Sequence, residues 1–196
     1  MNYLRLIPIS LLVVGVTFTG CFTKKVKRID PSEQTDLSGR WNDTDSRLVS
    51  NEMITDALQR PWRGNFAQEN SKAPTVIIGE VVNNTHEIIP TETFIKDMEK
   101  AFINSGMVSV AQGGDFRKQM REEREDQQTN SSKETMKKFG MEKGADYILT
   151  GMMSSIVDKE GRNKIVFYQV DLELTDLETN EKVWIGDKKI KKAVKN

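Results

Sequence analysis

The stretch NKIVFYQVDLELTDLETNEKVWIGDKKI, residues 163–190, decides the fold that we expect for this chain. In its first half every second side chain is apolar or aromatic: Val166, Tyr168, Val170, Leu172 and Leu174. A period of two residues is typical of a strand with one buried face. The turn residues at 176–180 lead into a second apolar run around Trp184, so this stretch predicts a β-hairpin.

Two further apolar segments extend this hairpin into a sheet. Residues 146–156 form another strand-like run, joined to residue 163 by a turn around Gly161, which makes a three-stranded antiparallel meander. TVIIGEVV, residues 75–82, is nearly unbroken apolar, which indicates a central strand covered on both faces. A short strand is expected at 107–111. Because the strands at 75–82 and 107–111 are each followed by a helix, they should run parallel.

We therefore predict an α/β (α+β) fold with a mixed sheet of about five strands. Two parallel βα units come first, the antiparallel meander follows, and helices pack on the sheet. One helix should begin near Ser46, capped by Thr44 or Asp45, and stop at Pro61. A second should begin at Thr91, which caps it, and be closed by Gly106. Residues 62–74, which lack periodicity, should form a loop.

Two more helices are expected between residues 113 and 144. The first begins at Gly113-Gly114-Asp115 and runs to about Gln127, mostly charged, with Phe116 and Met120 as its anchors. The charged run at 121–126 alternates acids and arginines, as on a solvated, salt-bridged face. The second is opened by a capping box, Ser131-x-x-Glu134, and carries Met136 and Phe139.

The N-terminal 21 residues are typical of a secretory signal. Arg5 precedes an apolar run from residue 6 to 18, and Thr19 and Gly20 precede Cys21, the only cysteine. The alternative of a retained membrane span would need about 20 apolar residues, and this run is shorter. The residues 18–21, FTGC, resemble a bacterial lipobox with Phe in place of the usual Leu. We predict a signal peptide at 1–21 with lipidation of Cys21, a basic tether at 22–35 and one globular domain at 36–196.

The charge balance argues against a nucleic-acid partner. Arg5 is the only charged residue before Cys21, so of 29 basic and 29 acidic residues the remainder keeps 28 and 29. A nucleic-acid binder needs a basic face that neutralises phosphates. Four basic residues at 24–28 would instead support the lipid anchor, since each adds about 1 kcal/mol of attraction to anionic head groups; a solvated linker is the alternative.

No catalytic, metal or cofactor site is predicted. His86 is the only histidine and has no cysteine partner for a zinc site. A Ser–His–Asp triad is formally possible, but no G-x-S-x-G motif accompanies it. We expect His86 to be an ordinary loop residue and the protein not to be an enzyme.

The segment 40–47 is the candidate partner-binding surface. An aromatic side chain beside several polar ones is the composition of an interface hot spot, and the residues are Arg40, Trp41, Asn42, Asp43, Asp45 and Arg47. The alternative is structural: Trp41 fastens the start of the first helix to the core, and Thr44 and Asp45 only cap it.

Three stretches carry a family resemblance: LSGRWNDTDSRLV at 37–49, GADYILTG at 144–151 and DLELTDLETNEKVWIG at 171–186. They resemble LpoB-like lipoproteins, activators of penicillin-binding proteins, and more widely CsgG-like periplasmic lipoproteins. The resemblance implies a non-enzymatic periplasmic domain, lipid-anchored to the outer membrane with the inner membrane as the alternative. Its implied partner is a bifunctional penicillin-binding protein. A CsgG-like protein that self-assembles is the alternative function.

The expected tether is short for that family, whose members are expected to carry a long proline-rich one. Fourteen flexible residues have an r.m.s. reach of about 20 Å and a maximum of about 50 Å. The reach of the anchored domain therefore limits which partners it can contact.

Overall fold

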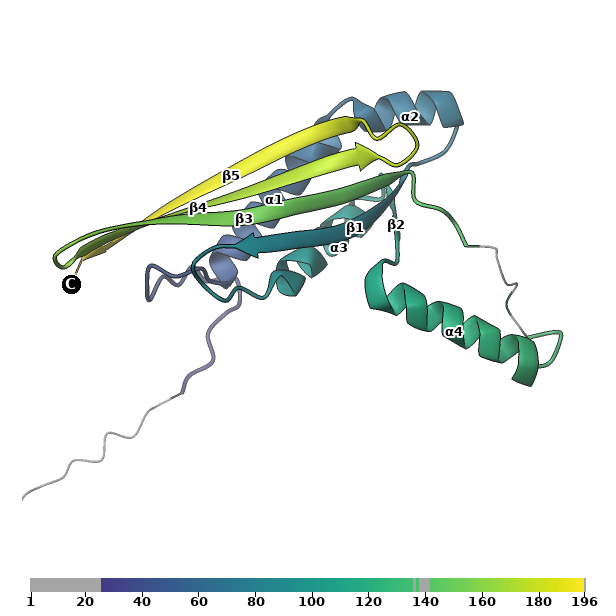
Figure 1. Ribbon diagram of the computed structural model, residues 1–196, viewed down its shortest axis with the longest axis horizontal. Coiled ribbons are helices and arrows are strands. Elements are labelled where there is room, and N and C mark those ends of the chain that lie inside the picture. Colours follow the sequence, from purple (N-terminus) through teal and green to yellow (C-terminus); the bar gives the residue numbers. More distant parts are fainter. Residues whose placement is uncertain (1–25, 136, 138–141, 196) are drawn as a thin grey trace, which may run out of the picture. The chain divides into compact units, whose positions relative to one another are not determined.

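The computed structural model of the chain describes residues 26–135, 137 and 142–195, with the side chain of Lys195 left aside (Figure 1). Contacts divide the chain into two units, Met1–Glu33 and Gln34–Asn196. The described end of the first unit is a turn, in which the Ser32 amide and hydroxyl donate to Asp30 Oδ1 at 2.8 and 2.7 Å. The expected signal segment, the lipidation site Cys21 and the start of the tether lie outside the described residues.

The second unit is built on a five-stranded mixed sheet in the order β2-β1-β3-β4-β5. The strands are β1 (Thr75–Asn84), β2 (Ser109–Ala111), β3 (Tyr147–Glu160), β4 (Asn163–Asp176) and β5 (Lys182–Lys195). β1 pairs in parallel with β2 and β3, whereas β3, β4 and β5 are antiparallel neighbours. This topology confirms the predicted fold class.

The period of two residues in β4 determines which face of the sheet is buried. The five alternating side chains from Val166 to Leu174 are at most 1% exposed. Leu149 and Met153 of β3 lie opposite Leu174 and Val170 and are also buried. Gly161 and Asn180, both with positive φ, form the two turns of the meander.

Two helices cover that buried face (Figure 1). Helix α1 (Asp43–Gln59) packs against α3 (Thr91–Ser105) and β5, and α3 packs against β1 and β2. Each helix contributes an apolar stripe at helical spacing: Val49, Met53 and Ala57 from α1, and Phe94, Met98 and Phe102 from α3. Gly106 ends α3 in the left-handed conformation, as predicted.

The opposite face of the sheet carries exposed apolar side chains. Val82 is 41%, Met152 39% and Ile156 66% exposed. The prediction that the 75–82 strand is covered on both faces was therefore wrong, because α1 and α3 lie on one face only.

Two other local predictions were also wrong. Residues 62–70 form helix α2 (Trp62–Asn70) rather than a loop, because Trp62 and Phe66 are buried edge-on against Tyr147 with ring centroids 5.1 and 5.6 Å away. The helix expected from Ser131 does not begin there, since residues 133–135 form a turn. Met136 and Phe139 lie outside the described residues.

Helix α4 (Gly114–Asn130) begins and ends near its predicted bounds but buries none of its residues. Its expected anchors, Phe116 and Met120, are 59% and 47% exposed. Two expected caps also differ. Asn42 rather than Thr44 or Asp45 caps α1, and Pro90 precedes α3 without a side-chain cap from Thr91.

Candidate functional site

The segment before α1 is fastened to β5 by a buried lysine. Asn42 and Asp45 form a reciprocal capping box, with the Asp45 amide donating to Asn42 Oδ1 at 3.1 Å and the Asn42 amide donating to Asp45 Oδ2 at 2.9 Å. The same Asp45 Oδ2 accepts from Lys192 Nζ at 2.6 Å, and the two side chains are only 6% and 12% exposed. Asp45 thus joins the start of α1 to the last strand.

Lys192 holds two further groups of this segment. Its Nζ donates to Asp36 Oδ1 at 2.8 Å and to the Arg40 carbonyl at 3.0 Å. Burial opposes the ammonium charge, but the hydrogen bonds to Asp36 and Asp45 outweigh it and raise the pKa of Lys192. The hydrogen bond from Lys192, followed by that from Asn42, lowers the pKa of Asp36.

Trp41 belongs to a second cluster, which we call the Trp41 cluster: Trp41, Ser46, Glu87 and Tyr168. The indole lies edge-on to Tyr168 with centroids 5.5 Å apart, and its Nε1 donates to Ser46 Oγ at 2.8 Å. Glu87 accepts from the Trp41 amide at 3.1 Å and from the Tyr168 hydroxyl at 2.8 Å. These contacts give Trp41 a structural part in joining the segment before α1 to β4.

The buried Tyr168 hydroxyl also lies 3.1 Å from the Gly39 carbonyl, a second acceptor for its single proton. Burial, followed by the hydrogen bond to Glu87, raises the pKa of Tyr168 well above its ordinary value. The phenol therefore remains a neutral donor at physiological pH.

His86 lies beside this cluster in a Ser–His–carboxylate arrangement. Its Nδ1 is 2.6 Å from Ser155 Oγ, and its Nε2 is 3.3 Å from Glu87 Oε1. Ser155 Oγ also accepts from the His86 amide at 3.0 Å. Because Glu87 is already bound by Tyr168 and Trp41, the arrangement holds the 85–90 loop to β3 and to the Trp41 cluster.

The structure brings the six predicted partner-binding residues together at the start of α1 but divides them by exposure. Trp41, Asn42 and Asp45 are engaged in the contacts above. Arg40 and Asp43 are exposed, and the Arg47 side chain is 32% exposed with Nη1 3.9 Å from Asp43 Oδ2. Arg40, Asp43 and Arg47 are thus the ones accessible to a partner.

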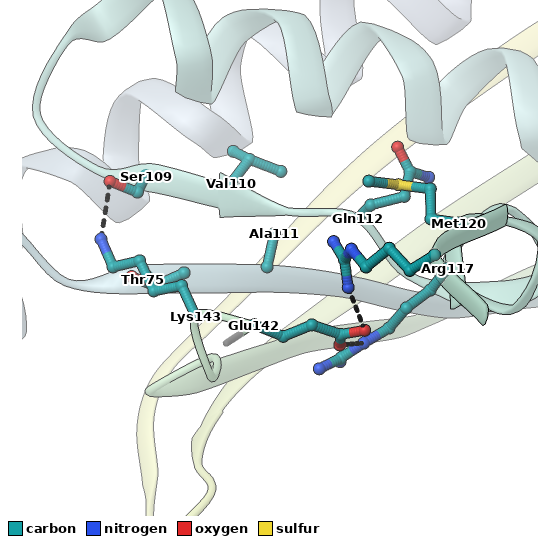
Figure 2. A pocket seen from close by; sticks show the side chains of 10 residues that line it. Thr75, Ser109, Val110, Ala111, Gln112, Arg117, Met120, Glu142 and Lys143 are labelled. Carbon is teal, nitrogen blue, oxygen red and sulfur yellow. Dashed lines mark hydrogen bonds and ion pairs between the residues drawn. The ribbon is translucent and has the colours of Figure 1, made fainter. Parts of the chain in front are cut away.

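A cavity on another part of the sheet was not predicted from the sequence. It has a volume of about 280 Å³ and lies between β2, the beginning of β1, α4 and the residues just before β3 (Figure 2). Glu142 meets Arg117 and Arg124 of α4 there, and the sequence pattern had assigned Arg124 to a solvated face. Because Glu142 is separated by 18 residues or more from its arginine partners, local spacing contains no signal for this site.

The described ranges contain no group of three metal-ligating His, Cys, Asp or Glu side chains. They also contain no helix of sufficient length and hydrophobicity to span a bilayer.

The fold and these clusters define a small α/β domain with one helix-covered sheet face and an N-terminal segment fastened across β4 and β5. The chain belongs to the LpoB family, peptidoglycan-synthase activator LpoB, whose model matches residues 45–190. The match extends from the first turn of α1 into β5. It confirms the resemblance inferred from the sequence.

Solved structures of LpoB are similar to this chain. The C-terminal domain from Escherichia coli matches with a TM-score of 0.47 and 14% identity, covering 74% of this chain and 98% of that one. The C-terminal domain from Salmonella enterica matches with a TM-score of 0.42 and 16% identity, covering 78% and 99%. The NMR structure of E. coli LpoB matches with a TM-score of 0.41 and 11% identity, covering 100% and 95%. A search of curated proteins found no match.

Proposed function

We propose that this chain is a lipid-anchored periplasmic protein that binds a bifunctional penicillin-binding protein and stimulates its peptidoglycan synthesis. The observation that carries the proposal is the family match over residues 45–190, because members of that family are peptidoglycan-synthase activators. The chain acts in this proposal by binding and not by catalysing a reaction itself.

The candidate contact surface is the exposed part of the start of α1: Arg40, Asp43 and Arg47. The contacts of Trp41, Asn42 and Asp45 hold the backbone of this segment in one conformation. A rigid backbone lowers the entropy cost of binding. Because charges held in fixed positions select a partner with complementary charges, even a few of them can form a specific contact.

The anchor in this proposal is an acyl group on Cys21, which holds the domain at the periplasmic face of the outer membrane. The support is the signal-like segment with its lipobox-like end. Labelling cells with radioactive palmitate should mark the wild-type chain and leave a Cys21→Ala variant unlabelled. Equal labelling of both chains would contradict this part of the proposal.

Crosslinking in intact envelopes followed by pull-down tests the partner. We expect recovery of a bifunctional penicillin-binding protein, and its loss when Arg40→Glu and Arg47→Glu are combined. Lys118→Glu on α4, where the side chain is 76% exposed, also reverses a surface charge but lies away from this surface, and it is the control for each single Arg→Glu change. Recovery of self-oligomers alone would contradict the proposal and favour the CsgG-like alternative.

A further inference from the structure

Three arginines of α4 converge on one carboxylate. Figure 2 shows one of them, Arg117, beside Glu142. Arg117 Nε lies 3.0 Å from Glu142 Oε2, and Arg124 Nη1 lies 2.6 Å from Glu142 Oε1. Arg121 binds both oxygens, through Nε at 3.0 Å and Nη2 at 3.2 Å. The arginines are four and three residues apart, which places them on one face of the helix.

The charges at this cluster are unequal. Three guanidinium groups face one carboxylate, and Lys143, which lines the same cavity, adds a fourth cation. Each guanidinium has five N–H donors, whereas Glu142 accepts from four nitrogen atoms in total. Most donors therefore remain available to a second acceptor, and the local net charge is positive.

The electrostatics of Glu142 agree with this excess. Hydrogen bonds from Arg121 and then Arg117 lower the pKa of Glu142 to about 2. A site that stabilises one anion so strongly is suited to others with planar or tetrahedral oxygen atoms, because the guanidinium fork matches carboxylates and phosphates.

The cavity beside the cluster also has an apolar side and one unsatisfied hydroxyl. Val110, Ala111 and Met120 line it next to the arginines. Thr75 also lines it and is 1% exposed, and its Oγ1 has no hydrogen-bond partner among the described residues. Because buried hydroxyls are rarely left unpaired, Thr75 is a second, independent indication that the cavity binds a ligand with a polar group.

We propose that this cavity is an oxyanion-binding site for a ligand that carries a phosphate or carboxylate group next to a small apolar part, and that Glu142 occupies the arginines when the ligand is absent. The anionic group binds Arg117 and Arg124, which line the cavity, and the apolar part contacts Val110, Ala111 and Met120. Binding then requires the ligand to compete with, or sit beside, the chain's own carboxylate. This site is independent of the proposed contact surface at the start of α1.

Titration of the full-length chain and of E142Q with inorganic phosphate, phenyl phosphate and phenylacetate tests the proposal. Binding is measured by calorimetry and by the NMR signals of the arginine Nε–Hε groups at low salt. Removing the internal carboxylate removes the competitor and one negative charge, so we expect E142Q to bind about tenfold more tightly than the wild type. Phenyl phosphate should bind several-fold more tightly than phosphate because its ring buries apolar surface.

Control variants separate the site from general surface charge. R124Q should weaken binding about tenfold, whereas K118Q, which removes a charge from another part of α4, should leave it unchanged. Binding of phenyl phosphate alone or of phenylacetate alone identifies which oxyanion the site takes, and either supports the proposal. It is overturned if E142Q binds none of the three probes more tightly than the wild type, or if R124Q binds as the wild type does. If E142Q loses its far-UV circular dichroism signal, it does not fold, and the R117Q/R124Q double variant is titrated instead. Loss of probe binding in this variant supports the site, and binding equal to that of the wild type overturns it.

Discussion

Replacing Trp41 by Ala tests whether the segment before α1 is part of the folded core. The change removes the edge-on contact with Tyr168, which is worth about 0.5–1.5 kcal/mol. It also removes the hydrogen bond to Ser46 Oγ, worth about 0.5–1.5 kcal/mol, and the burial of part of the indole, worth about 1–2 kcal/mol. The free energy of unfolding should fall by about 3 kcal/mol, which corresponds to roughly 10 °C in Tm for a domain of this size.

Urea denaturation followed by far-UV circular dichroism measures this loss. Trp41→Phe is the comparison variant, because it keeps a ring against Tyr168 and loses the indole N–H with part of the ring area, so it should cost less than Trp41→Ala, about 1–2 kcal/mol. Refutation would come from a Trp41→Ala protein that unfolds at the wild-type urea concentration and yet no longer binds its synthase. Trp41 would then be a partner contact and not a structural one.

Three further predictions concern other parts of the fold. Gly151→Ala should lower the free energy of unfolding by about 1–3 kcal/mol, because an added Cβ would lie 2.6 Å from the Asp171 carbonyl of β4. Gly144→Ala meets open space and should cost little in the same urea experiment. The Glu142 carboxyl should titrate near pH 2 in a carbon-13 NMR experiment. Because its folded pKa is lowered, its contribution to stability is complete above the ordinary pKa of 4.5 and is lost as the pH falls towards 2. A titration midpoint near 4.5 would be contrary to the structure. Burial raises the folded pKa of Tyr168 above 10, so its contribution to stability is present below pH 10 and is lost as the pH rises through the folded pKa. The wild type should therefore lose stability above pH 10 more steeply than Tyr168→Phe. Equal slopes of stability against pH in alkaline unfolding would rule this out.

The sheet could be predicted because its strands carry a local pattern. The alternation from Val166 to Leu174 marks one buried face, and the turns at Gly161 and Asn180 fix the order of the meander. The apolar stripes of α1 and α3 are local signals of the same kind. The existence and type of these elements follow from residues that are neighbours in the sequence.

The elements that were missed depend on distant residues. Helix α2 has only two buried side chains, Trp62 and Phe66, and both pack on Tyr147, which lies about eighty residues later. The uncovered side of β1 could not be inferred either, because an apolar run does not show how many faces have helices above them. These features are decided by tertiary packing and not by local propensity.

The sequence predicted which segment at the start of α1 forms the candidate site. It did not predict which of its side chains hold the segment in place and which remain exposed. The cap between Asn42 and Asp45 is local, but the ion pair of Asp45 and the aromatic contact of Trp41 come from Lys192 on β5 and Tyr168 on β4. A composition rule cannot separate side chains that hold the backbone from those that remain exposed. The cavity around Glu142 was missed for the same reason.

The most direct test of the central claim is a reconstitution assay with the bifunctional penicillin-binding protein of the same cell. The purified chain is added to the purified synthase with lipid-linked peptidoglycan precursor, and the rate of glycan polymerisation and the extent of peptide cross-linking are measured. The account predicts that both rise when the wild-type chain is added and rise less with the Arg40→Glu/Arg47→Glu variant. An unchanged rate at concentrations where the two proteins crosslink would contradict the assignment of this chain as a synthase activator.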